Sequence, residues 1–112
     1  MAVVRAPELR TIRGRLGLSQ ESFSRVLDVS ARSVERWEAR GATRMDAEAA
    51  RRLAVTQEIL ALAVEVYGED VATFMTTPRR SLGLRTPREA MVRGDLEQVR
   101  QVLVDGLEGH WT

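Results

Sequence analysis

Hydrophobic residues recur three and four positions apart along most of the chain, and this spacing places side chains on one face of an α-helix. Capping residues, glycines and prolines divide the pattern into separate helices. The predicted helices lie between Pro7 and Gly17, Ser19 and Asp28, Ser30 and Gly41, Asp46 and Tyr67, Glu69 and Met75, Thr86 and Gly94, and Asp95 and Leu107. The pattern therefore predicts an all-α protein.

The stretch 16–41 is predicted to form two short helices joined by a tight turn. Ser19 and Ser30 are good N-caps, and Asp28 occupies the turn, where the usual residue is a glycine but Asp also tolerates a left-handed backbone. The inner faces of the pair are predicted to consist of Phe23, Val26, Leu27, Val34 and Trp37. These offsets are typical of a helix-turn-helix, which places its second helix in the major groove of DNA. A hairpin of the same shape used only for packing or protein contact is the alternative.

The outward face of the second helix carries Arg32 and Arg36, which we expect to reach the edges of DNA bases. Each arginine could instead contact phosphate or remain solvated. Gln20, at the start of the first helix of the pair, is predicted to hold a phosphate group and fix the register. The other candidate DNA contacts on the second helix are Ala31, Ser33 and Glu35.

The distribution of charge along the chain agrees with a DNA-binding region in its N-terminal half. The 112 residues carry a net charge of +1, but residues 1–60 contain 11 arginines against 8 acidic residues, and residues 61–112 contain 6 against 8. All 17 basic residues are arginine, which reflects codon bias or suits the recognition of guanine and phosphate. The basic excess thus coincides with the candidate DNA-binding region.

Composition argues against catalysis. The chain has no cysteine and a single histidine, His110, so a thiolate nucleophile and a metal site of His and Cys ligands are excluded by count. The length allows one modest core but no large enzyme cleft. We expect a protein without catalytic residues, metal or cofactor. With no apolar stretch near the roughly 20 residues of a membrane span and no signal peptide, a cytoplasmic protein without a membrane partner is expected.

The long helix 46–67 is predicted to be buried on several sides, because two apolar stripes run along it. The stripes are Leu53, Leu60, Ala63 and Tyr67, and Val55, Ile59, Leu62 and Val66, with little polar face beyond Arg51 and Glu58. We expect this helix to act as a hub that joins a DNA-binding region, 1–45, to a C-terminal module, 68–112. A second copy of the chain, giving a homodimer, or the chain's own elements could cover the remaining stripe.

The C-terminal module shows two further helix starts. Thr86, Pro87 and Glu89 have the spacing of a capping box with proline at the first helical position, and Asp95 with Gln98 repeats the capping pattern. The last helix has a predicted buried stripe of Leu96, Val99, Val102, Leu103 and Leu107. Trp111, beside the chain end, is interpreted as a contact for another protein, with local packing as the alternative.

The C-terminal module carries two distinctive segments, the run TPRRSLGLRTPREAMVRGD and the ending Glu108 to Thr112. Together with the helix pair at 16–41, these segments resemble the antitoxins of the Xre/MbcA/ParS toxin-binding type. The resemblance implies a bacterial antitoxin whose partner is a RES-domain, NAD-consuming toxin and whose N-terminal region binds the operator DNA of its own operon. Toxin contact would then fall on Arg79, Arg80, Ser81, Arg85, Gly109, His110 and Trp111.

Three functions are therefore open at the level of sequence. The first is a type II antitoxin that neutralises its toxin by direct binding and represses its own transcription. The second is a stand-alone dimeric transcription regulator whose C-terminal half serves only dimerisation. The third is an interaction scaffold without DNA binding, in which the arginines of helix 31–40 merely add solubility.

Overall fold

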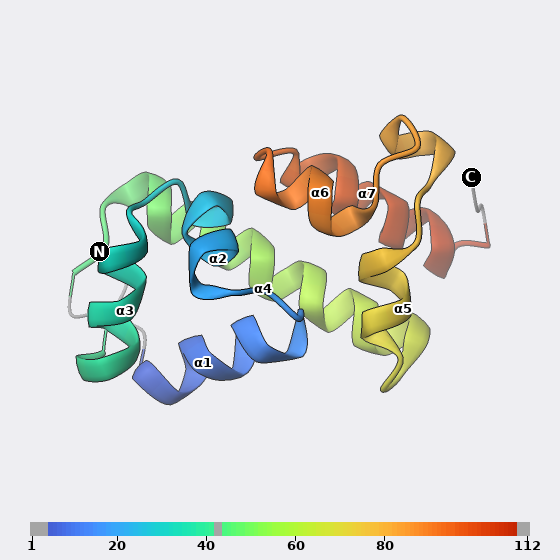
Figure 1. Cartoon of the computed structure of the whole chain (residues 1–112). Coiled ribbons are helices and arrows are strands. Elements are labelled where there is room, and N and C mark those ends of the chain that lie inside the picture. Colours follow the sequence, from blue (N-terminus) through green and yellow to red (C-terminus); the bar gives the residue numbers. More distant parts are fainter. Residues whose placement is uncertain (1–4, 42–43, 110–112) are drawn as a thin grey trace.

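The computed structural model describes residues 5–41 and 44–109, and this part of the chain is entirely helical apart from turns and one isolated bridge between Arg79 and Arg85. The elements are α1 (Ala6–Arg15), α2 (Gln20–Leu27), α3 (Ala31–Arg40), α4 (Ala47–Tyr67), α5 (Val71–Thr76), the short 3-10 helix η1 (Arg80–Leu82), α6 (Pro87–Val92) and α7 (Leu96–Leu107). The all-α prediction is confirmed. The molecule measures 40 × 24 × 22 Å, with α1–α3 towards one end and α5–α7 towards the other (Figure 1).

The ends of α2 and α3 are fixed by local side chains. The hydroxyl of Ser19 accepts from the amide of Ser22 at 3.0 Å, and that of Ser30 accepts from the amide of Ser33 at 3.1 Å. Asp28 ends α2 with φ of 56° and ψ of 50°, in the left-handed region. Both predicted caps and the left-handed turn are thus confirmed, and the short turn fixes how α3 leaves α2.

Helix α4 runs along the whole molecule and contacts elements at both of its ends (Figure 1). It begins where Asp46 Oδ1 accepts from the amide of Ala49 at 2.7 Å and ends at Gly68, which has φ of 62°. Its 21 residues span about 32 Å at 1.5 Å each. The prediction of a hub helix is confirmed, with α7 as its main neighbour and α2, α5 and α1 also packed on it.

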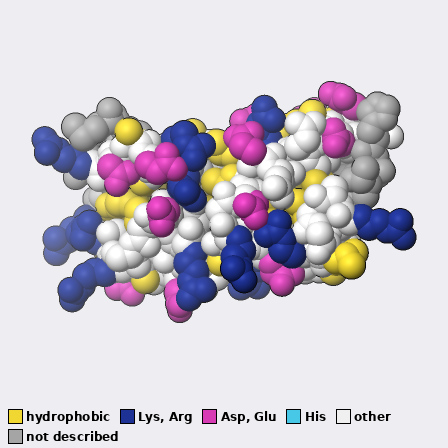
Figure 2. Space-filling model, turned by 90° about the horizontal axis from the view of Figure 1, so that it is seen from above, with side chains coloured by type: hydrophobic (Ala, Val, Ile, Leu, Met, Phe, Trp, Pro, Cys, Tyr) yellow, Lys and Arg dark blue, Asp and Glu magenta, His cyan; other side chains and the backbone are white. Residues whose placement is uncertain are grey.

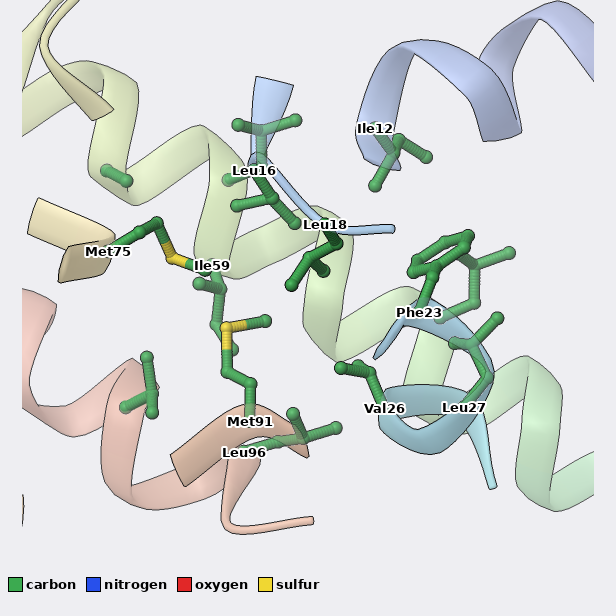
Figure 3. Close-up of a cluster of buried hydrophobic side chains, with 14 of the residues drawn as sticks. Ile12, Leu16, Leu18, Phe23, Val26, Leu27, Ile59, Met75, Met91 and Leu96 are labelled. Atoms are coloured by element: carbon green, nitrogen blue, oxygen red, sulfur yellow. The ribbon is translucent and has the colours of Figure 1, made fainter. Parts of the chain in front are cut away.

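A single hydrophobic core extends through the molecule. Phe23 from α2, Ile59 from α4 and Met91 from α6 are fully buried in it, and Figure 3 shows these side chains within one cluster. Helix α2 also packs directly against α6. The three predicted segments 1–45, 46–67 and 68–112 therefore share one core, and their division into domains stays a prediction.

The apolar stripes of α4 are covered to different degrees. Leu53, Leu60, Ala63 and Ile59 are buried, whereas Val55, Leu62, Val66 and Tyr67 are only half-buried. The polar face is wider than predicted, because Glu48, Gln57 and Glu65 are also exposed beside Arg51 and Glu58. The chain's own elements thus cover much of the hub helix.

Two predictions about α7 are wrong. Leu107 is 44% exposed instead of buried, because α7 ends at this residue. Asp95 makes no capping hydrogen bond to α7, since its Oδ2 accepts instead from Arg85 Nη1 at 2.7 Å. By contrast, the capping box of Thr86 and Glu89 at the start of α6 is present with both of its hydrogen bonds.

Candidate functional site

The exposed face of α3 is rich in arginine. Val34 and Trp37 are 1% and 7% exposed and face the core, whereas Arg32 and Arg36 are exposed on the opposite side, as predicted. Arg40, one turn after Arg36, extends the same face. Figure 2 shows arginine side chains projecting from the end of the molecule at which α3 lies.

Further arginines, which sequence reasoning did not select, lie where α3 ends. A hollow there is lined by Arg36, Trp37, Arg40, Gly41 and Arg44. Within the described residues, the ion pairs do not involve Arg32, Arg36, Arg40 or Arg44. Their charges are thus not neutralised by neighbouring carboxylates, so they remain available to an anionic partner. The signal in the sequence was the continuation of the four-residue spacing from Arg32 through Arg36 to Arg40.

The other predicted DNA contacts differ in position. Glu35 is exposed on the face of Arg32 and Arg36, whereas Ala31 and Ser33 are half-buried in the first turn of α3. The hydroxyl of Ser33 is 3.0 Å from that of Ser30, within the cap. Of the five predicted residues on α3, the structure therefore brings three onto one outward face and sets the other two on its flank.

Gln20 is directed towards α3 rather than standing free. Its side-chain amide donates a hydrogen bond to Glu38 Oε1 at 3.1 Å. The Glu38 carboxylate also accepts hydrogen bonds from Arg13 Nε at 2.6 Å and from Arg13 Nη2 at 3.0 Å. Arg10 donates to the Glu38 main-chain carbonyl. Glu38 is 4% exposed, so a carboxylate buried on the inner side of α3 connects α1, α2 and α3.

The charge of Glu38 is stabilised in this position. Burial by itself raises the pKa of its carboxyl, but the hydrogen bonds from Arg13 and Gln20 and the charges of Arg13 and Arg10 outweigh it and lower the pKa below the ordinary value of 4.5. Glu38 is not among the residues predicted from the sequence. The available signal was its position one turn after Val34, on the inward side of the helix.

The candidate partner-binding arginines of the C-terminal module fall into two kinds. Arg79 is half-buried: its guanidinium carbon lies 5.2 Å from the ring centre of Phe74 and 5.9 Å from that of Tyr67, and it donates to the Tyr67 hydroxyl. Arg85 donates from Nε to the Leu82 carbonyl at 2.8 Å and also holds Asp95. Both side chains therefore fix the loop 79–85 to the rest of the module.

Arg80 and Ser81 are exposed on the outer side of this loop. Gly109 is exposed after the end of α7, with φ of 81°. His110 and Trp111 lie outside the described residues. Of the predicted partner contacts, the structure thus brings Arg79, Arg80, Ser81 and Arg85 together in one loop.

Two other kinds of site are absent from residues 5–41 and 44–109. No helix among them is both long and apolar enough to cross a membrane. They also contain no group of three or more His, Asp or Glu side chains arranged to hold a metal ion.

The fold and candidate site define a small all-α protein in which a long central helix connects an arginine-rich exposed helix to a separate candidate partner-binding loop. No family model matches the sequence, and no curated protein matches it. The chain is similar to MbcA in the crystal structure of the M. tuberculosis MbcT–MbcA toxin–antitoxin complex, with 26% sequence identity and a TM-score of 0.68. The match covers 96% of this chain and 96% of the other. This similarity supports an antitoxin role.

Proposed function

We propose that the protein is a type II antitoxin that binds and neutralises a RES-type, NAD-consuming toxin and represses its own operon. The observation that carries the proposal is the similarity to MbcA, because it covers the helix pair, the hub helix and the C-terminal module alike. The RES identity of the toxin rests on the resemblance of the two C-terminal segments.

Operator binding is assigned to the exposed face of α3. Arg32 and Arg36 present planar guanidinium groups, which suit the acceptor pair of guanine in the major groove. Arg40 and Arg44 extend the positive charge beyond them and suit phosphate contacts. The Glu38 network supports this assignment, since it fixes the orientation of α3 relative to α1 and α2.

The DNA-binding part is tested by the affinity of Arg36→Ala for the promoter upstream of its gene. We expect a loss of about 1 to 3 kcal/mol for a contact to a base. Arg88→Ala is the matched control, because it removes the same charge from an exposed position on α6 in the other module. If both variants lose the same affinity at about 150 mM salt, Arg36 does not read a base.

The toxin-binding part is tested by co-expressing the full chain with the protein encoded beside it. We expect the two to co-purify and the NAD content and growth of the cells to be preserved. Deletion of residues 109–112 tests the predicted contacts of Gly109, His110 and Trp111, and we expect it to weaken neutralisation. If no neighbouring protein binds while the promoter is bound, a stand-alone dimeric regulator is the better description.

A further inference from the structure

Leu84 is unusual in its exposure. The residue is 70% exposed, whereas nearly all other large hydrophobic residues in the described part of the chain are buried or half-buried. Leu107, at the end of α7, is the other exposed large hydrophobic residue in the described part of the chain, with an exposed fraction of 44%. Both belong to the C-terminal module, so the exposed apolar surface lies in the region proposed to bind a protein.

The backbone at Leu84 is also unfavourable for leucine. Gly83 and Leu84 have φ of 68° and 64°, and the amide of Arg85 donates to the Leu82 carbonyl at 3.3 Å, which closes a turn with positive φ at both central positions. Such turns favour Gly, Asn and Asp, because other side chains clash with their own backbone. Leucine at this position is thus unfavourable to the stability of the fold for two reasons, its left-handed backbone conformation and the exposure of its apolar side chain to water.

The loop that carries Leu84 is rigidly held. Its ends are joined by the hydrogen bonds from the Leu84 amide to the Arg79 carbonyl, 2.9 Å, and from the Arg79 amide to the Arg85 carbonyl, 3.0 Å. The contacts of the Arg85 side chain to Leu82 and Asp95 fasten it to α7, and Leu82 itself is buried. Figure 1 shows the loop after α5 projecting from the body of the molecule. Leu84 is therefore presented in one fixed place before any partner arrives.

The charges around the loop indicate what kind of surface Leu84 meets. Residues 79–93 contain five arginines and one glutamate. Arg80 and Arg88 are exposed, whereas Arg85 is paired with Asp95. A complementary surface has an apolar pocket with carboxylates on its rim.

We infer that Leu84 is an anchor that inserts into an apolar, acid-rimmed pocket of the toxin. This inference rests on the proposed function, because the toxin is the occupant to which it commits. A preformed loop loses little conformational entropy on binding, so the burial of the leucine side chain contributes directly to affinity. The unfavourable backbone at Leu84 is then a cost to folding that binding offsets.

The test compares Leu84→Gly, Leu84→Asn and Leu84→Met in the full chain, with the purified toxin encoded beside it as the probe. Gly and Asn both accept positive φ, so we expect neither to lower the melting temperature. Both should weaken toxin binding by at least about tenfold, the effect of losing one buried leucine side chain. Leu84→Met keeps an apolar side chain of similar volume on the same backbone and should bind within about threefold of the natural chain.

The outcomes separate the two proposals. A loss of affinity without a loss of stability supports the anchor, because unfolding cannot explain it. If the natural chain binds the toxin and both Leu84→Gly and Leu84→Asn bind it equally well, the anchor is overturned and the antitoxin function stands. If they change the self-association of the chain instead, the occupant is a second copy and the anchor is also overturned. If the natural chain does not bind the toxin at all, the proposed function fails and the anchor with it.

Discussion

Replacing Glu38 by alanine tests whether a buried carboxylate fixes α3. The substitution removes the acceptor of three hydrogen bonds, two from Arg13 and one from Gln20. Deleting one partner of a buried ion pair typically costs about 3 to 5 kcal/mol. The Arg13 side chain is 24% exposed and can be rehydrated, so we expect a smaller loss of about 2 to 3 kcal/mol in the free energy of unfolding.

The loss is measured by urea denaturation followed by circular dichroism at neutral pH. For a chain of this length it corresponds to a fall of about 8 to 12 °C in melting temperature. Glu21→Ala is the control, because the Glu21–Arg25 pair on α2 has exposed side chains, 71% and 63%, and such pairs contribute less than about 1 kcal/mol. If Glu38→Ala costs no more than Glu21→Ala, the buried network does not hold α3 in place.

The same variant has a predicted pH dependence. Because the pKa of Glu38 is lowered in the folded chain, its stabilising contribution is present above the ordinary value of 4.5 and is lost as the pH falls through the lower folded value. Two other carboxyl groups also have lowered pKa values in the folded chain. Arg51 and Arg52 lower the pKa of Glu48 to about 2, and the hydrogen bonds from Thr86 lower that of Glu89. The informative quantity is therefore the difference between the natural chain and Glu38→Ala, which should shrink on acidification below pH 4.5. A difference that stays constant would contradict the assigned interaction.

Two smaller changes test the local structure. Asp28→Gly should raise the stability by about 0.5 kcal/mol, because glycine accepts φ of 56° and the substitution removes a negative charge at the C-terminal end of α2; a lower melting temperature would contradict this reasoning. Thr86→Ala should lower the stability by about 1 kcal/mol through loss of the capping box, and Thr86→Ser should restore most of it in the same denaturation experiment.

The candidate partner-binding loop, 79–85, could be predicted from the sequence only in part. The run 77–95 carries the resemblance to antitoxins, but it does not distinguish the arginines that fasten the loop from those that face outward. Arg79 stacks on Phe74 and Tyr67, and Arg85 binds Asp95. Leu84 was not selected as a contact, because its significance arises from its exposure and its positive φ together.

The sequence by itself determined the features that depend on residues within about one helical turn of each other. These include the caps Ser19, Ser30, Asp46 and Thr86, the left-handed Asp28, the length of the hub helix and the outward direction of Arg32 and Arg36. Here the interacting groups are close in the chain, so that local spacing fixes their geometry.

The tertiary structure decided which polar groups meet across long distances in the chain. Glu38 contacts Arg13 and Gln20, which lie 25 and 18 positions away, and Asp95 contacts Arg85 instead of capping its own helix. These choices depend on which helix faces pack together, and burial then requires each charged group to find a partner. Periodicity places Glu38 on the inner side of α3, but only the packing of α1 and α2 against it supplies the arginine and the amide that keep it charged there.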